Sequence, residues 1–143
     1  MQTLTQLLAQ NNRQPVVVSP KDTVYHALQV MADNDVGAVL VMDGEKLVGI
    51  FSERDYARKV ILSGRNSRDT RIEAVMTSKV AYVTPAHSLA ACMSLMTEHR
   101  FRHLPVLDDE ERLLGVVSMG DLVKATLSHQ EFIISELERY ITR

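Results

Sequence analysis

The chain has 143 residues, 45% of them hydrophobic and 24% charged, which fits a folded domain with a real core and excludes general disorder. Its formal net charge of −2 argues against broad electrostatic attraction to nucleic acid. The only cysteine is Cys92, which excludes an internal disulfide and a cysteine-based zinc site. Because no apolar run is long enough to span a bilayer, we expect a soluble, cytoplasmic protein with no membrane insertion.

The first predicted element is a helical extension over residues 1–15, with Leu4, Leu7 and Leu8 on one face. A matching C-terminal helix is predicted over residues 128–143. Its apolar face consists of Phe132, Ile133, Leu137, Tyr140 and Ile141. We expect both faces to pack within their own chain, and the alternative is that they join two chains.

Residues 16–63 are repeated as residues 80–127. Ser19-Pro20 aligns with Thr84-Pro85, and after one inserted residue LVGIFSERD (47–55) aligns with LLGVVSMGD (113–121). The apolar positions between them align as well: Ala27, Met31 and Val41 match Cys92, Met96 and Val106. The chain is therefore two copies of one unit, and Cys92 is expected to be a buried thiol rather than a nucleophile.

Each copy predicts the order strand, helix, strand, strand, helix. Short apolar runs at 16–18 and 81–83 predict strands, and helical spacing of apolar residues begins after them, near residues 24 and 89. Asp22 is the candidate cap of the first helix, and His87 or Ser88 that of the second, with Asp22 the better candidate. Two further runs in each copy predict a hairpin, and helical composition follows at 53–62 and 119–127. The predicted class is α+β, with two pseudo-symmetric units packed sheet to sheet and extra terminal helices.

A linker is predicted over residues 64–79. Ser63 to Arg71 is polar, contains a glycine and carries three arginines. We expect these arginines to be solvated, and phosphate contact is the weaker alternative.

The segments most suggestive of chemistry are GIFSERD (49–55) and GVVSMGD (115–121). Each places a serine, Ser52 or Ser118, at a strand end and an aspartate, Asp55 or Asp121, in the first helical turn. Such a carboxylate can accept both hydroxyls of a ribose, while the serine and the free helix amides can donate to phosphate. Simple helix capping is the alternative.

The duplicated motif resembles that of CBS domains, and residues 16 to about 127 resemble a tandem CBS pair, or Bateman module. The resemblance implies that an adenosine ligand such as AMP, ADP, ATP, NAD(H) or S-adenosylmethionine lies between the copies. The aspartate then binds ribose, with the serine near ribose or phosphate. Arg54, inside the first motif, is included among the nucleotide-binding candidates.

By the same resemblance, Arg102 and His103 face Asp55, like the phosphate-contacting pair of the gamma subunit of AMP-activated protein kinase in reversed order. The arginine fork suits phosphate. The alternative is a solvated helix end with a packed polar histidine. Gly37 and Ala38 occupy the matching positions for Asp121 and supply no cation, so the Asp55 site is expected to favour phosphate more strongly.

Weaker candidates complete the predicted site. Ser19 and Thr84 precede the two prolines and by resemblance contact adenine or phosphate, with strand-end capping as the alternative. Val36 and Phe101 line an adenine pocket or belong to the core. His99 and His103 lack a convincing metal-ligand spacing.

The sequence therefore predicts a non-catalytic regulatory module with an adenine nucleotide as its ligand and no catalytic cofactor or metal. Its output would pass through a homodimer or through a regulated enzyme or transporter. One alternative is a small nucleotide-processing enzyme in which Glu53 or His103 positions water. The other is a ligand-free assembly adaptor.

Overall fold

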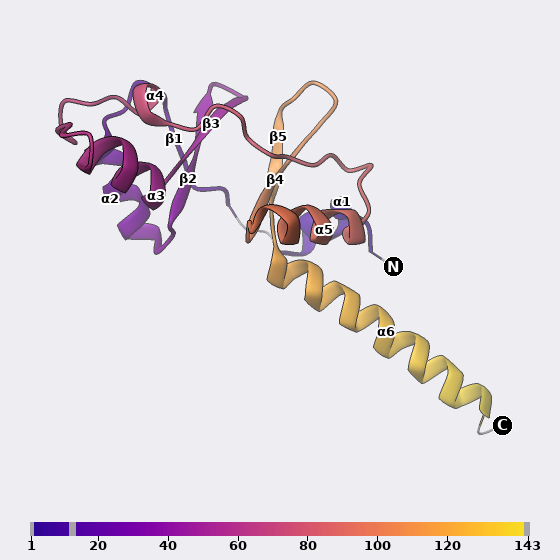
Figure 1. Ribbon diagram of the computed structural model, residues 1–143. Helices are drawn as coiled ribbons and strands as arrows, with labels where there is room; N and C mark the ends of the chain where they lie inside the picture. Colours follow the sequence, from indigo (N-terminus) through magenta and orange to yellow (C-terminus); the bar gives the residue numbers. More distant parts are fainter. Residues whose placement is uncertain (1, 12–13, 142–143) are drawn as a thin grey trace. The chain divides into compact units, whose positions relative to one another are not determined.

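The computed structural model describes residues 2–11 and 14–141, and these form two compact units (Figure 1). Residues 15–81 and 111–113 make up the first-repeat unit, and residues 1–14, 82–110 and 114–143 the second-repeat unit. The α+β class with two repeated units is confirmed, and the sheet-to-sheet packing of the units stays a prediction.

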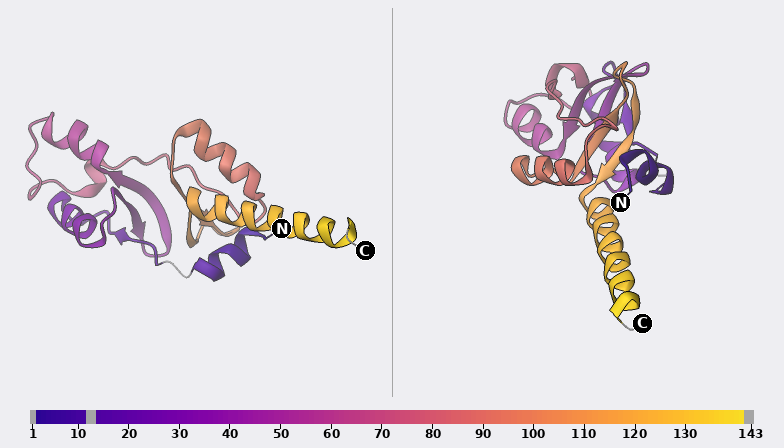
Figure 2. Two further views of the ribbon diagram at one scale, coloured as in Figure 1. Left: turned by 90° about the horizontal axis from the view of Figure 1, so that it is seen from below. Right: turned by 90° about the vertical axis from the view of Figure 1, so that its right-hand side faces the viewer.

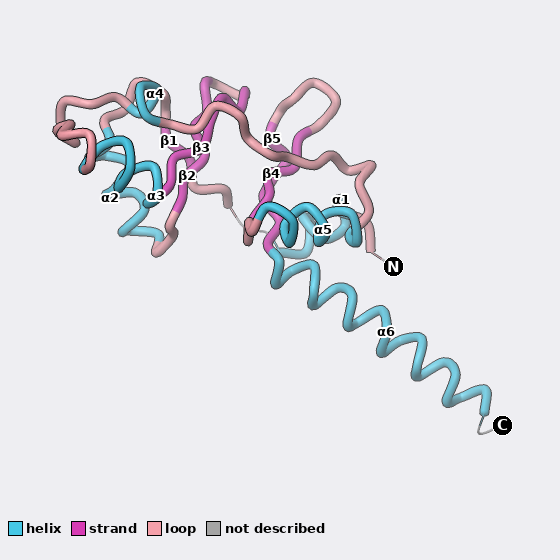
Figure 3. Tube along the Cα trace, viewed as in Figure 1, coloured by secondary structure: helices cyan, strands magenta, loops and turns pink. Residues whose placement is uncertain are grey.

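The first-repeat unit contains a three-stranded sheet in the order β1 (Val17–Val18), β2 (Ala38–Asp43), β3 (Lys46–Ser52) (Figure 3). β1 runs parallel to β2, and β2 pairs antiparallel with β3 as the predicted hairpin. Gly44, with φ +63°, turns that hairpin in the left-handed conformation that glycine adopts without strain. The predicted order of elements is thus confirmed in this unit.

Helices α2 (Val24–Asn34), α3 (Glu53–Asp55) and the π-helical η1 (Tyr56–Ile61) complete the repeat. Alternating strand residues and one face of α2 form a single core, because strand side chains alternate between faces and helical ones recur every three or four residues. Its buried members are Val18, Val24, Ala27, Met31, Val39, Val41, Phe51, Val60, Ile72 and Val75.

The cap predicted for α2 is wrong. Thr23, not Asp22, caps the helix by accepting from the His26 amide at 3.1 Å. Asp22 instead accepts from the Ser19 amide at 2.8 Å and closes the preceding turn. In the second copy Ser88 caps α5 (Leu89–His99), as one of the two predicted candidates.

The segment predicted as a linker takes part in the first-repeat core. It contains the short helix α4 (Ile72–Val75), whose Ile72 is fully buried and Val75 nearly so. Thr77 exchanges two backbone hydrogen bonds with Ile50 of β3, at 2.8 and 2.9 Å. The polar composition of the preceding residues hid this role, because only tertiary packing brings the segment onto the sheet.

The second-repeat unit has a two-stranded sheet of β4 (His103–Leu107) and β5 (Leu113–Ser118). The strand predicted at 81–83 is reduced to one bridge between Val83 and Val106. α1 (Leu4–Asn11) belongs to this unit, with Leu4 fully buried and Leu7 nearly so. The expectation that the N-terminal face packs within its own chain is confirmed.

The last helix, α6 (Met119–Ile141), runs without a break across the boundary predicted between residues 127 and 128. It extends beyond α1, α5 and the β4–β5 sheet of its unit (Figure 2). The apolar face that we expected to pack within the chain is exposed, and this expectation is wrong. Its members are Phe132, Ile133, Leu137, Tyr140 and Ile141.

Candidate functional site

The first motif forms the junction between β3 and α3. Ser52 ends the strand, and its hydroxyl accepts from the Asp55 amide at 3.2 Å. The Asp55 carboxylate accepts in return from the Ser52 amide at 3.0 Å, which completes a capping box. The capping alternative is therefore confirmed as local geometry, and ribose binding by Asp55 stays a prediction.

Asp55 is buried, with 7% of its surface exposed, and its carboxylate has four donors close by. Oδ2 accepts from the amide and, at 3.1 Å, from the hydroxyl of Ser52. Oδ1 accepts from the Thr77 hydroxyl at 3.0 Å and lies 3.1 Å from Lys59 Nζ. Because a carboxylate has about four lone-pair positions, each ribose hydroxyl that binds here has to replace one of these donors.

Sequence reasoning missed Lys59 and Thr77. Lys59 lies four residues after Asp55, a spacing that brings side chains together on a helix and that was a usable signal. Thr77 lies 22 residues from Asp55 along the chain and reaches it only through the pairing with Ile50. No local pattern marks Thr77.

The glycine of the first motif has a packing role. A Cβ on Gly49 would lie 2.6 Å from Met76 Sδ and 3.0 Å from the Thr77 carbonyl oxygen. Only a residue without a side chain lets the 76–77 segment approach β3 closely enough to pair with Ile50 and to present Thr77 to Asp55. The motif glycine thus supports the carboxylate site indirectly.

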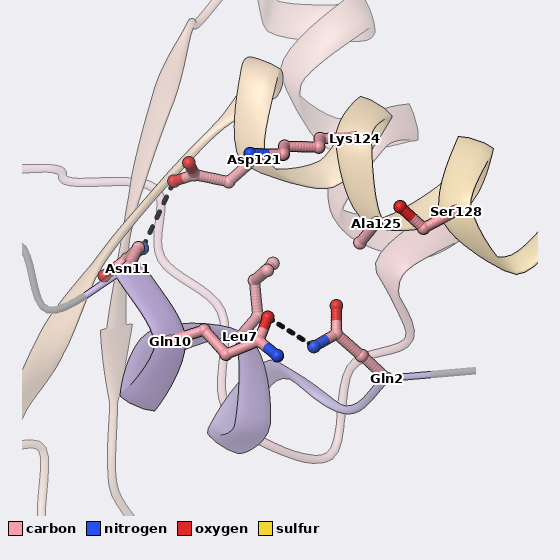
Figure 4. Close-up of a pocket in the computed structure, with 8 residues that line it drawn as sticks. All are labelled: Gln2, Leu7, Gln10, Asn11, Asp121, Lys124, Ala125 and Ser128. Carbon is pink, nitrogen blue, oxygen red and sulfur yellow. Dashed lines mark hydrogen bonds between the residues drawn. The ribbon is translucent and has the colours of Figure 1, made fainter.

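The second motif repeats the serine–aspartate geometry at the start of α6. Ser118 donates its amide to Asp121 Oδ2 at 3.1 Å, and its hydroxyl accepts from the Asp121 amide at 3.0 Å. Asn11 of α1 donates to the same carboxylate oxygen at 3.2 Å (Figure 4). Asp121 and Asn11 line a pocket between α1 and α6, together with Gln2, Leu7, Gln10, Lys124, Ala125 and Ser128.

The two motifs differ in charge. At the positions aligned with Lys59 and Arg54 of the first repeat, the second has Ala125 and Gly120. Ala125 is buried, with 6% of its surface exposed, so this position packs within its unit and carries no charge. At these two aligned positions the first repeat therefore supplies cations and the second does not, in addition to the difference in cations predicted from the sequence.

The residues before the prolines close turns. The Ser19 amide donates to Asp22, and the Thr84 amide donates to His87 Nδ1 at 3.1 Å. The Thr84 hydroxyl lies 3.2 Å from the same histidine nitrogen. The capping alternative describes their local structure, and their contacts to a ligand stay predictions.

Arg102 and His103 lie in the second-repeat unit, where Arg102 is exposed and His103 begins β4. The Arg102 carbonyl accepts from the Met119 amide at 2.8 Å, so the residue lies beside the start of α6. In the first repeat the Gly37 carbonyl accepts the equivalent hydrogen bond from the Glu53 amide, at 3.0 Å. The approach of Arg102 and His103 to Asp55 stays a prediction, since the two residues and Asp55 belong to different units.

The remaining candidates divide between surface and core. Arg54 is exposed, and Phe101 is also exposed and stacks on His99 with ring centroids 5.5 Å apart. Val36 packs against the first-repeat core, as the core alternative anticipated. Cys92 is fully buried, and burial raises the pKa of its thiol.

No group of three histidine, cysteine, aspartate or glutamate side chains within residues 2–11 and 14–141 is arranged to hold a metal ion. In the same part of the chain, no helix combines the length and apolar character needed to cross a membrane.

Comparison with known proteins decides the family. The model of the CBS domain matches residues 9–62 and 72–128. The chain belongs to the CBS family. It is a tandem CBS pair, and both matches begin before the repeat boundaries at 16 and 80 predicted from the sequence.

Relatives extend over most of this CBS pair. The CBS domain-containing protein CBSX3, mitochondrial, of Arabidopsis thaliana is 42% identical over 125 residues, covering 84% of this chain and 60% of that protein. The chain thus spans less than two thirds of CBSX3. A solved CBS-domain protein from Burkholderia ambifaria MC40-6 is 49% identical with a TM-score of 0.76, covering 90% of this chain and 96% of that one.

Two solved CBS relatives carry adenine nucleotides. CBSX2 in complex with AMP is 27% identical, with a TM-score of 0.67 and coverage of 80% of this chain and 88% of that one. The cytosolic domain of the Mg²⁺ channel MgtE in complex with ATP is 31% identical, with a TM-score of 0.64 and coverage of 78% and 44%. Homologues of this CBS pair therefore bind AMP or ATP.

Proposed function

We propose that this CBS pair is a non-catalytic regulatory module that binds an adenine nucleotide, with Asp55 and Ser52 at the better-equipped site and Asp121 and Ser118 at a second one. The observation that carries the proposal is the oriented, nearly buried carboxylate of Asp55 at a helix start, in a family whose members bind AMP and ATP. Ser19, Val36, Arg54, Thr84, Arg102 and His103 are the further candidate contacts.

The chemistry of the site supports ribose recognition. A carboxylate is an acceptor only, so it can take both hydroxyl hydrogens of a ribose diol. Its orientation is fixed in advance by the Ser52 amide, which reduces the ordering that binding costs. The guanidinium of Arg102 is suited to phosphate, because its planar fork can donate two hydrogen bonds to one phosphate group.

Regulation follows if nucleotide binding favours one arrangement of the two units over another. A ligand shifts such an equilibrium only by its difference in affinity for the two arrangements. The output would reach a second copy of the chain or a regulated enzyme or transporter. Neither an attached effector nor a catalytic cofactor is part of this proposal.

Calorimetry on nucleotide-stripped protein tests the proposal with adenosine, AMP, ADP, ATP and NAD. Asp55→Asn keeps the size of the side chain but removes one acceptor and the charge, so we expect at least a tenfold loss of affinity for every adenosine ligand. Asp33→Asn, an exposed aspartate on α2, is the matched control and should bind like the parent. Circular dichroism establishes that both variants are folded.

Arg102→Ala separates phosphate recognition from ribose recognition. It should weaken AMP more than adenosine, and equal losses for the two ligands would contradict the role of Arg102. Absence of binding to any of the five compounds would instead support a ligand-free assembly adaptor. Sustained hydrolysis of AMP or ATP that Asp55→Asn abolishes would support an enzyme.

A further inference from the structure

The turn that leads into the first helix of each repeat is closed by a side chain, and this side chain differs between the repeats. In the first repeat the Asp22 carboxylate accepts from the Ser19 amide at 2.8 Å. In the second repeat His87 Nδ1 accepts from the Thr84 amide at 3.1 Å. The acceptor lies three residues after the donor in both turns. The same turn is therefore built once on a carboxylate and once on an imidazole.

The backbone of the two turns is alike. The Asp22 amide donates to the Ser19 carbonyl, and the His87 amide to the Thr84 carbonyl, both at 3.0 Å. In the first repeat α4 also holds the turn, because the Ile72 amide donates to the Asp22 carbonyl at 2.9 Å. Within residues 2–11 and 14–141, no backbone amide of another element donates to the His87 carbonyl. The second turn therefore depends more on its side chain.

The hydrogen bond from Thr84 defines the protonation state of His87. A backbone amide can only donate, so Nδ1 is the unprotonated nitrogen of a neutral ring. The Thr84 hydroxyl lies 3.2 Å from the same nitrogen and donates to it in that state. Its hydrogen is then directed to His87, and its lone pairs are left to accept from a ligand. The amino group of adenine is a donor of the kind that this hydroxyl can bind.

We propose that His87 is a positioning residue, which holds Thr84 as a hydrogen-bond acceptor for adenine and releases it when the imidazole takes up a proton. The proposal rests on the nucleotide-binding function, in which Thr84 is a candidate contact. Histidine ordinarily gains a proton between pH 8 and pH 5, whereas a carboxylate stays ionised and keeps accepting. A protonated imidazole carries a hydrogen on both nitrogens, so it cannot accept from Thr84. Acidification therefore disturbs the second turn and spares the first.

The surroundings of His87 leave its ring free to take up a proton. The ring is exposed, and in the described part of the chain only the amide and hydroxyl of Thr84 hydrogen-bond to it. No carboxylate of these residues forms an ion pair with it, either from α5 or from β4. Asp22, in contrast, lies 3.8 Å from His26 Nε2. Protonation of His26 adds a charge beside Asp22 but leaves the carboxylate an acceptor.

Nuclear magnetic resonance of the isotope-labelled full chain tests the link between His87 and Thr84 without a ligand. Between pH 8 and pH 5 the Thr84 amide signal should move together with the titration of the His87 ring, and the Ser19 amide should not follow it. His87→Asn keeps a neutral acceptor throughout this range, so it should abolish the movement. His129→Asn, on α6, is the matched control and should preserve it. A Thr84 amide that does not respond in the parent, or that responds equally in His87→Asn, overturns the proposal.

Calorimetry with adenosine at pH 8 and pH 5 tests the effect on binding. Adenosine is the probe because a phosphate monoester such as AMP itself gains a proton in this range. Loss of one net hydrogen bond corresponds to a factor of about 2–10 in affinity, so the parent should bind adenosine that much more weakly at pH 5. His87→Asn should lose less affinity on acidification than the parent and His129→Asn. Thr84→Val, which lacks the hydroxyl, should already bind weakly at pH 8.

The outcomes of the two experiments separate this proposal from the nucleotide-binding function. Equal losses of affinity on acidification in the parent and in His87→Asn overturn the positioning role of His87. A Thr84→Val variant that keeps the affinity and the pH profile of the parent overturns the role of the hydroxyl. A parent that binds adenosine at neither pH contradicts the nucleotide-binding function, while the amide titration still decides whether His87 holds Thr84.

Discussion

Replacing Gly49 by alanine tests the packing that presents Thr77 to Asp55. The added Cβ would lie 2.6 Å from Met76 Sδ, 3.0 Å from Met76 Cγ and 3.0 Å from the Thr77 carbonyl oxygen. The methionine can change rotamer, but the carbonyl is held in its hydrogen bond from the Ile50 amide at 2.9 Å. Overpacking of this kind costs about 1–3 kcal/mol.

Two other glycines provide a graded comparison. A Cβ on Gly115 would lie 3.0 Å from Leu8 Cδ2, the mobile end of a side chain, so we expect Gly115→Ala to cost less than about 1 kcal/mol. A Cβ on Gly120, in α6, would meet only Ser118 Oγ at 3.7 Å. Since alanine is favoured over glycine within helices by up to about 1 kcal/mol, Gly120→Ala should be neutral or stabilising.

Thermal unfolding followed by circular dichroism measures the series. Gly49→Ala should lower the midpoint temperature of unfolding, Tm, by about 3 °C or more, and Gly115→Ala should lower it by less. Gly120→Ala should leave the Tm unchanged or raise it. The steric reasoning is refuted if Gly49→Ala is as stable as the parent, or if Gly120→Ala is the most damaging of the three.

Four further predictions concern the Asp55 site, the cap of α2 and the Cys92 thiol. Lys59→Met removes the cation paired with Asp55, so adenosine should bind severalfold more tightly in calorimetry, and weaker binding would contradict competition between the lysine and ribose. Thr23→Ala should cost about 1 kcal/mol in urea unfolding through loss of the α2 cap, whereas no change would show that the cap is dispensable. Burial raises the pKa of Cys92 above its ordinary 9.0, so the folded chain should react with a thiol reagent far more slowly at pH 8 than the chain in urea. The same shift should lower the free energy of unfolding as the pH rises above 9.0, because the thiol of the unfolded chain ionises before that of the folded chain. A urea-unfolding midpoint that does not change with pH above 9.0 would contradict this prediction.

Local signals predicted the parts of this protein that local interactions determine. The capping box of Ser52 and Asp55 depends on residues three positions apart. The hairpin depends on a short turn at Gly44 between two neighbouring strands. The buried face of α1 was evident from the spacing of its leucines. In each case the pattern that allows the prediction lies within a few positions of the chain, even where, as for α1, the residues that bury it lie far away.

The errors lie where distant segments meet or fail to meet. α4 follows the polar residues 63–71, and the sheet that buries it is not evident from its own sequence. The donor from Thr77 to Asp55 has the same origin. The apolar face of α6 was misjudged for the opposite reason, since helical periodicity shows that a face is apolar but not what covers it.

Each repeat is completed by a segment that precedes the other one. α4 and Thr77 come before the second repeat and pack on the first, whereas α1 comes before the first repeat and packs in the unit of the second. During synthesis the chain emerges from its N-terminus. α1 must therefore remain unpaired until more than one hundred later residues have been added and α6 is available. α1 is synthesised before either repeat but is buried only after the second one has been made. A ribosome that paused between the repeats would leave the apolar face of Leu4 and Leu7 exposed to solvent.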